Sequence, residues 1–206
     1  MPRSGEATRQ RILDAAEQLV YGHGFAAASL DKVVALAGVT KGALFYHFDS
    51  KAELGHAVVE RFAARDRELL ESTMARAERL SDDPLQQFLV VTGLIQEDAE
   101  RHLEPAPGCL FASFIYEHLE YPEAVGRIAQ DAFLAWRERL VEKLDAAVAL
   151  HRPAGPFDTV DVADLFTTVI EGGYVMAKVL GDGGLLGRHL AHYRRYVAML
   201  FTDAAG

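Results

Sequence analysis

The sequence predicts an all-α protein of about nine helices, and three observations lead to this prediction. Apolar residues recur at intervals of three and four, which places them on one face of a helix. From residue 50 onward, no segment shows the strict alternation of apolar and polar residues that is typical of a half-buried strand. Glycines, prolines and capping residues divide the 206 residues into segments of helical length. We expect residues 1–50 to form one small domain and residues 51–206 to form a second.

The first expected helix carries one apolar stripe and ends at a pair of glycines. The stripe falls between residues 12 and 20, and Gly22-His23-Gly24 then interrupts the helix. Three short helices at the N-terminus, each with a single apolar face, can bury these faces only against one another. The stripe consists of Ile12, Leu13, Ala16, Leu19 and Val20.

The second expected helix is bounded by a capping residue and a glycine. Ser29 is a suitable N-cap, and the apolar stripe that follows has the spacing of one buried helical face. Gly38 ends the helix, because a residue without Cβ adopts the left-handed conformation at little cost. Val39 can fill the corner before the next helix. The stripe consists of Leu30, Val33, Val34 and Ala37.

The third expected helix starts at Thr40 and has two different sides. Leu44, Phe45 and Phe48 supply its apolar bulk. The opposite side carries small residues, which let a helix backbone approach base edges, and donors that reach base acceptors or phosphate oxygens. Two short helices joined by a glycine turn are typical of a helix-turn-helix DNA-binding motif.

The fourth expected helix begins at Ser50, because Ser50-Lys51-Ala52-Glu53 has the pattern of a capping box. Lys51 then lies at a helix start, whose amide groups favour an anion. This arrangement predicts a DNA-binding surface, with an ordinary solvated surface as the alternative. The predicted DNA-binding residues are Ser29, Thr40, Lys41, Gly42, Ala43, Tyr46, His47 and Lys51.

The segment GVTKGALFYHFDSKAEL resembles the recognition segment of the tetracycline-repressor-like (TetR/AcrR) bacterial transcriptional regulators. The segment before it, TRQRILDAAEQLVYGHGFAAASL, is similar to the first helix of that family and its Gly-x-Gly-Phe exit. Beyond about residue 60 the similarity is limited to architecture. The resemblance implies a homodimeric repressor that binds a palindromic DNA operator and is released by a small-molecule effector.

The net charge of −9 is unevenly distributed along the chain. Residues 1–51 are close to neutral, so the remaining 15 Lys/Arg and 25 Asp/Glu make the rest of the chain acidic. Acidity outside the predicted DNA-binding domain would keep that part away from the duplex, and the weak positive charge of the domain favours binding as a dimer. The charges in residues 1–51 are Arg3, Arg9, Arg11, Lys32, Lys41 and Lys51 against Glu6, Asp14, Glu17, Asp31 and Asp49.

The second domain is expected to contain the long fourth helix and five others. Asp83 is a suitable N-cap with Pro84 at the first helical position, and Pro and Gly residues mark breaks at 104–108 and 152–156. The turn 181–184 separates the last two helices. The expected helices are 50–80, 83 to the break at 104, 109–120, 122–150, 158–180 and 186–202.

In TetR-like proteins the last two helices pack against the same pair of a second subunit. The pair Gly172-Gly173 lies in the middle of a predicted helix, where each glycine costs up to ~1 kcal/mol relative to alanine, and this cost indicates close helix contact. The alternative is that both helices close the core of a single chain. The predicted dimer interface is Val169, Gly173, Ala177, Leu190, Tyr193 and Val197.

The resemblance also implies an effector pocket among the helices of the second domain. Aromatic side chains with few polar groups could line it, and the alternative is that they are ordinary core. The predicted pocket residues are Phe88, Thr92, Cys109, Phe111, Phe114, His118, Phe133, Trp136, Phe166 and Tyr174.

Cys109, the single cysteine, supports an alternative function as a sensor of oxidants or electrophiles. It follows Pro107-Gly108, in the predicted first turn of a helix, where the helix dipole lowers the pKa of a thiol. Some TetR-like repressors that respond to such reagents resemble this chain in a Gly-Cys-Leu sequence. The other interpretation is a small buried apolar residue.

An enzyme and a helical adaptor are less favoured alternatives. Cys109 and His118 are separated by roughly 13 Å of helical rise, so they cannot form a catalytic pair. The histidines show no metal-ligand pairing, and we expect no metal and no cofactor. No long apolar run and no signal-peptide pattern is present, so we expect a cytoplasmic protein, which suits a single cysteine.

Overall fold

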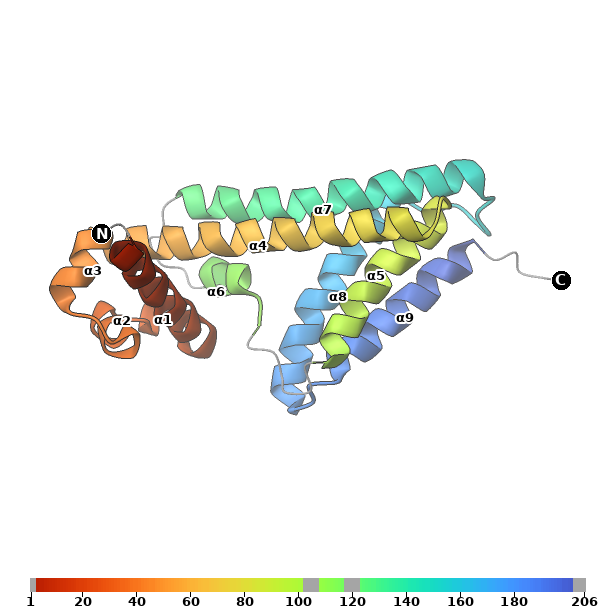
Figure 1. Ribbon diagram of the computed structural model, residues 1–206. Coiled ribbons are helices and arrows are strands. Elements are labelled where there is room, and N and C mark those ends of the chain that lie inside the picture. Colours follow the sequence, from red (N-terminus) through yellow and green to blue (C-terminus); the bar gives the residue numbers. More distant parts are fainter. Residues whose placement is uncertain (1–2, 102–107, 117–122, 202–206) are drawn as a thin grey trace. The chain divides into compact units, whose positions relative to one another are not determined.

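The computed structural model describes residues 3–101, 108–116 and 123–201, which form nine helices and contain no strand (Figure 1). This result confirms the all-α prediction. The helices are α1 (Arg3–Ala27), α2 (Leu30–Ala37), α3 (Lys41–His47), α4 (Lys51–Leu80), α5 (Pro84–Arg101), α6 (Leu110–Tyr116), α7 (Glu123–Leu150), α8 (Thr159–Leu180) and α9 (Leu185–Leu200).

The chain packs as two compact units. Unit one comprises residues 1–65 and 108–131, and unit two comprises residues 66–107 and 132–206. Helices α4 and α7 therefore contribute residues to both units. The division falls inside α4, whereas the boundary predicted from the sequence lies at the start of that helix. The first turns of α4 belong to unit one because they bury Leu54, Val58 and Val59 there.

Helix α1 changes direction at a glycine. Gly24 has a φ of 81° and a ψ of 164°, values outside the helical region, and the helical geometry persists through Gly22 and His23 before it. The break predicted for residues 22–24 is therefore confined to the last of them. Glycine adopts this backbone conformation without the steric cost that a Cβ would bring.

Helix α2 has the N-cap that the sequence predicts, and Thr40, the predicted start of the third helix, caps α3. The Oγ atom of Ser29 accepts the N–H of Lys32 at 3.3 Å, and Oγ1 of Thr40 accepts the N–H of Ala43 at 3.1 Å. Gly38 is left-handed at a φ of 62° and ends α2. The turn is closed by two hydrogen bonds, from Gly38 N–H to the carbonyl of Ala35 and from Val39 N–H to the carbonyl of Val34.

The apolar side of α3 is narrower than predicted. Leu44 and Phe48 are fully buried, whereas the side chain of Phe45 is 43% exposed. Successive residues of a helix are rotated by about 100°, so a buried Leu44 and Phe48 turn Phe45 toward the edge of the buried face. The prediction that Phe45 belongs to the buried stripe is therefore wrong.

The start of α4 forms a variant of the expected capping box. Oγ of Ser50 accepts the N–H of Glu53 at 3.1 Å, as predicted. The Glu53 carboxylate accepts the N–H of Asp49 at 2.6 Å, one residue earlier than in the standard motif. Both interactions fix the direction in which α4 leaves α3.

Unit one is held together by an ion cluster and by aromatic contacts. Arg61 of α4 pairs with Asp14 at 2.7 Å and with Glu17 at 2.5 Å on α1. The ring of Phe25, after the kink in α1, lies 4.7 Å from the ring of Phe114 on α6. A Cβ atom at Gly55 of α4 would lie 2.6 Å from the Phe25 ring, so the glycine permits this contact.

Unit two has one apolar core, to which all of its helices contribute. Asp83 caps α5 through its carboxylate, as predicted. Asp158 caps α8 in the same way, and Gly181 ends α8 in the left-handed conformation. The linker after α7 is fixed to the end of α9 by the hydrogen bond from Ala154 N–H to the carbonyl of Leu200, at 2.7 Å. The largest core side chains include Leu70, Met74, Phe88, Leu140, Leu144, Phe166, Leu190 and Tyr193.

Candidate functional site

The exposed side of α3 carries most of the predicted DNA-binding residues. Tyr46 is 83% exposed, Lys41 and Gly42 are exposed, and Ala43 and His47 are half-buried beside them. The ring of His47 contacts the ring of Tyr46, with 5.0 Å between their centroids. Unit one therefore presents a short helix with a cation, small residues and an aromatic hydroxyl on one open face.

Gly42 is not required by the packing of the chain. A Cβ atom at this position would have Oγ1 of Thr40, at 4.0 Å, as its nearest contact, so an alanine would fit here without a clash. Its φ angle also lies outside the left-handed region. Glycine costs up to ~1 kcal/mol in a helix relative to alanine, and nothing within the chain compensates this cost. No contact in the described structure therefore accounts for a glycine at this position.

Two predicted DNA contacts, Ser29 and Thr40, serve as helix caps in the chain itself. Their hydroxyl oxygens accept backbone N–H groups, and both residues remain exposed. Each hydroxyl keeps its own hydrogen for a further acceptor. A cap that also donates to a phosphate would fix α2 and α3 in their orientation on a duplex.

Lys51 lies at the end of α1 rather than open to solvent. Its Nζ donates to the carbonyl of Ala26 at 2.9 Å and lies 4.6 Å from the centre of the Phe25 ring. Nζ of Lys32 donates to the adjacent carbonyl of Ala27 at 3.0 Å. Two ammonium groups therefore satisfy the carbonyl end of α1, where the helix dipole favours positive charge.

Lys41 is bound to a carboxylate that sequence reasoning did not single out. Its Nζ lies 3.0 Å from Oδ1 of Asp31 on α2. The two residues are ten positions apart and meet only because the turn at Gly38 folds α3 back beside α2. A spacing that spans a turn gives no periodic signal, which explains why the sequence did not reveal this pair.

Most of the residues predicted for the dimer interface are buried inside one chain. A Cβ atom at Gly173 would lie 2.6 Å from Leu186 of the same chain, so this glycine permits close packing of α8 on α9. Tyr193 donates its hydroxyl to the carbonyl of Val162 at 2.7 Å, and burial raises the pKa of this phenol far above its ordinary value. These placements agree with the core alternative. The buried members are Gly173, Ala177, Leu190, Tyr193 and Val197, and Val169 is half-buried.

The opposite face of α8 carries an exposed stripe that sequence reasoning did not select. Its residues recur at intervals of four and three, the spacing of a helix that packs against another helix. Val175 is 59% exposed and Val179 is 75% exposed. We call these residues the α8 stripe: Leu165, Thr168, Gly172, Val175, Met176 and Val179.

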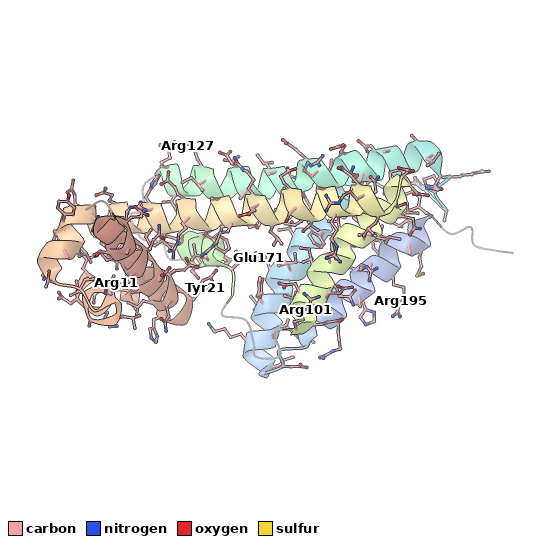
Figure 2. All side chains as sticks on the ribbon, in the orientation of Figure 1. Arg11, Tyr21, Arg101, Arg127, Glu171 and Arg195 are labelled. Carbon is pink, nitrogen blue, oxygen red and sulfur yellow. The ribbon has the colours of Figure 1, made fainter. Side chains whose placement is uncertain are left out.

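The exposed face of α9 combines apolar and basic side chains. Tyr196 and Met199 are exposed, and so is Arg195, which Figure 2 shows on α9. Both faces of α8 are apolar, and periodicity alone cannot decide which one lies inside the chain. The two adjacent glycines distinguish the two faces. Gly173 is needed for packing inside the chain, whereas a Cβ atom added at Gly172, in the α8 stripe, would meet no atom within 4 Å.

The residues predicted for the effector pocket are divided between the two units. Cys109, Phe111 and Phe114 belong to unit one, and His118 lies outside the described residues. The others belong to unit two. The buried ones are Phe88, Thr92 and Phe166, and the half-buried ones are Phe133, Trp136 and Tyr174. The Thr92 hydroxyl donates to the carbonyl of Phe88 at 3.0 Å.

The aromatic side chains of unit two form a connected cluster. The ring of Trp136 lies 5.8 Å from that of Phe166, and Phe166 lies 5.6 Å from Tyr193. Tyr193 in turn lies 6.3 Å from Phe88. Tyr193, which the sequence assigned to the dimer interface, therefore contacts two of the residues predicted for the pocket, Phe166 and Phe88.

Asp66 adds a polar group to this cluster that the sequence did not reveal. The indole N–H of Trp136 donates to Oδ2 of Asp66 at 3.0 Å. Burial raises the pKa of Asp66 above its ordinary value, because it disfavours the charged form, and the Trp136 hydrogen bond opposes this effect. Asp66 lies within a charged stretch of α4, and nothing in the neighbouring sequence indicates that its side chain is buried against Trp136.

Cys109 is half-buried and immediately precedes α6. Its carbonyl accepts the N–H of Ser113 at 3.1 Å, so the residue occupies the N-cap position rather than the first turn. Gly108 before it has a φ of 116°, a value that L-residues rarely adopt.

None of the helices in the described part of the chain combines the length and the apolar character needed to cross a bilayer.

Two family models match successive parts of the chain. The model described as bacterial regulatory proteins of the tetR family matches residues 12–58. The model described as the tetracyclin repressor-like C-terminal domain matches residues 93–193. The chain belongs to the TetR family. The first match covers α2 and α3, so the exposed face of α3 lies in the part that defines the family.

Relatives and solved structures agree with TetR membership. The HTH-type transcriptional regulator TtgR of Pseudomonas putida is 44% identical over 55 residues, which are 27% of this chain and 26% of that protein. The match thus spans about a quarter of that relative. An HTH-type regulator from Lactococcus lactis is 25% identical over 181 residues, or 87% of each chain.

The fold is shared with TetR-family structures. A regulator from Chloroflexus aurantiacus superposes with a TM-score of 0.79 at 23% identity, covering 98% of this chain and 100% of its own. A regulator from Agrobacterium tumefaciens superposes with a TM-score of 0.77 at 21% identity, covering 96% and 100%. These likenesses concern the fold.

Proposed function

We propose that this TetR-family protein is a DNA-binding transcriptional regulator that acts as a homodimeric repressor on a palindromic operator. Gly42 carries this proposal, because the open face of α3 keeps a glycine that the packing of the chain does not require. A backbone that approaches base edges in the major groove would require it. Such a regulator acts on the bacterial chromosome, in the cytoplasm.

The α8 stripe and the exposed face of α9 are the proposed dimer interface. Val175, Met176 and Val179 are exposed apolar residues, and a second copy of the chain would remove them from water. A two-fold axis brings the same face of both chains together, so the stripe needs no other partner. Gly172 would allow the two α8 helices to approach closely.

The proposed effector is a small, largely apolar or aromatic molecule that binds in unit two. The linked rings of Trp136, Phe166 and Tyr193 support this proposal. Asp66 is a polar group of this cluster that could accept a hydrogen bond from an effector. Effector binding would then change the arrangement of the two DNA-binding helices in the dimer and release the operator.

A second candidate function is covalent sensing by Cys109. The favouring observation is that the thiol belongs to a half-buried residue at the start of α6, whose Phe114 contacts Phe25 in unit one. Modification of the thiol would disturb the start of α6, and the Phe25 contact would transmit the change toward α3. Reversible binding and thiol modification make different predictions for a Cys109 variant.

Selection of bound sequences from random duplexes by the purified protein tests the main proposal. We expect enrichment of a palindrome whose half-sites are about one helical turn apart or a multiple of it. Enrichment of no sequence, at salt concentrations where other helix-turn-helix dimers bind, would contradict the proposal.

A further inference from the structure

One ion pair joins the two helices of the helix-turn-helix motif. Asp31 is the second residue of α2 and Lys41 is the first of α3, and their carboxylate and ammonium groups lie 3.0 Å apart. Both side chains are well exposed, Asp31 at 79% and Lys41 at 62%. The pair therefore lies on the open surface of unit one, at the N-terminal end of α3.

The fold does not depend on this pair. An exposed ion pair contributes about 0–1 kcal/mol to stability, whereas the turn is already fixed by Ser29, Gly38 and Thr40. A carboxylate on a surface that faces DNA also has a cost, because phosphates repel it. Asp31 also lies in the first turn of α2, where a carboxylate interacts favourably with the helix dipole by about 0.3–1 kcal/mol. This gain in stability is small, and Asp31 still weakens the attraction of this face for DNA.

We propose that Asp31 is a positioning residue that sets sequence specificity by holding the Lys41 ammonium at the base-reading end of α3. This inference rests on the proposed DNA-binding function. Lysine has a flexible four-carbon chain and a strongly attractive point charge for phosphates. Without a partner, Lys41 would contact the nearest phosphate on any duplex, whatever its sequence.

The chemistry of the pair suits base recognition. An ammonium group has three donors, and one donated to Asp31 leaves two for acceptors such as O6 and N7 of guanine. The pair has no net charge, so it adds little to non-specific attraction. The neighbouring lysines do not compete for Asp31, because Lys32 and Lys51 donate to the carbonyls of Ala27 and Ala26.

The test compares Asp31→Asn with the wild-type protein on the selected operator and on a scrambled duplex, between about 50 and 200 mM salt. We expect tighter binding of the scrambled duplex and a salt slope steeper by about 0.9 per bound subunit, since Lys41 is then free to contact a phosphate. The operator-to-scrambled affinity ratio should fall about tenfold, the scale of one base contact. Thermal unfolding should be nearly unchanged.

Asp49→Asn is the matched control, because it removes the same charge from an exposed residue of unit one that has no contact with Lys41 in the described structure. We expect this variant to strengthen binding to both duplexes in similar proportion, so the affinity ratio should stay near the wild-type value. A ratio that fell equally in both variants would overturn the role of Asp31.

The Lys41→Gln background separates positioning from direct contact. There we expect Asp31→Asn to leave the affinity ratio unchanged, because Asp31 acts through Lys41. An equal loss of ratio in both backgrounds would mean that Asp31 contacts bases itself, and would overturn the inference. If Asp31→Asn bound the operator with an unchanged operator-to-scrambled affinity ratio, that result would also overturn the inference. A wild-type protein that bound no duplex would overturn the proposed function, and this inference with it.

Discussion

Leu186 occupies the space that a side chain at Gly173 would need. A Cβ atom at Gly173 would lie 2.6 Å from Cδ1 of Leu186 and 3.5 Å from its backbone Cα. Helices α8 and α9 of one chain therefore pack through a glycine, and the buried face of α8 is committed to its own subunit. This contact leaves only the other face of α8 for a second subunit, which supports the proposed interface there.

The first prediction concerns this contact. Gly173→Ala forces Leu186 to shift inside the core, and overpacking of this kind costs about 1–3 kcal/mol in the free energy of unfolding. The better helix propensity of alanine returns up to ~1 kcal/mol. Gly22→Ala is the control, because Gly22 is helical and has no atom within 4 Å of the added Cβ. Denaturant unfolding of both variants gives the difference, and equal stabilities would contradict the packing argument.

The second prediction concerns the α8 stripe. Val175→Glu places a charge on an exposed residue, so we expect a folded chain that sediments as a monomer at low micromolar concentration. Leu150→Glu makes the same change at another exposed apolar residue, at the end of α7, and should leave the dimer intact. A Val175→Glu protein that remained dimeric would place the interface elsewhere.

The third prediction uses the raised pKa of Asp66. Because burial raises this pKa in the folded chain, ionisation of Asp66 costs stability once the pH exceeds the folded pKa, and costs nothing below the ordinary aspartate value of about 3.9. Asp66→Asn removes the charge and keeps an acceptor for the Trp136 N–H. We expect a higher melting temperature than wild type at pH 7, and a difference that shrinks as the pH falls toward 4.

Glu68→Gln serves as the control for Asp66, since Glu68 is an exposed carboxylate on the same helix. Its melting temperature should follow that of the wild-type protein across the same pH range. A difference for Asp66→Asn that did not change with pH would mean that the effect comes from packing rather than from ionisation.

The fourth prediction distinguishes the two modes of regulation. Cys109→Ser should keep operator binding and its release by a reversible effector, because the substitution preserves the size of the side chain and the backbone cap of α6. If Cys109 is a sensor, quinone-like electrophiles will release the wild-type protein from its operator and fail on the variant. Equal responses of the two proteins would exclude covalent sensing.

The local structure of this chain could be predicted because its signals act over three or four residues. Ser29 and Asp83 cap helices through their own side chains, and Gly38 ends α2 by its backbone freedom. The exposed side of α3 followed from the same local pattern, and only Phe45 was misplaced.

The parts of the site that depend on tertiary packing could not be predicted in this way. Helix α8 has two apolar faces, so periodicity did not indicate that Gly173 is internal and Val175 external. The Asp31–Lys41 pair spans a turn, and the Asp66–Trp136 hydrogen bond joins residues that are 70 positions apart. Such contacts become visible only when the helices are packed.

The binding of Gly42→Leu to the selected operator tests the proposed role of α3 with the least ambiguity. Gly42 is exposed, a Cβ atom added there has its nearest contact at 4.0 Å, and leucine is a better helix former than glycine, so the variant should be at least as stable as the wild-type protein. We predict that it remains folded and dimeric but binds the operator at least about tenfold more weakly, as expected for lost base contacts. Operator affinity equal to that of the wild-type protein would contradict the proposal that α3 enters the major groove.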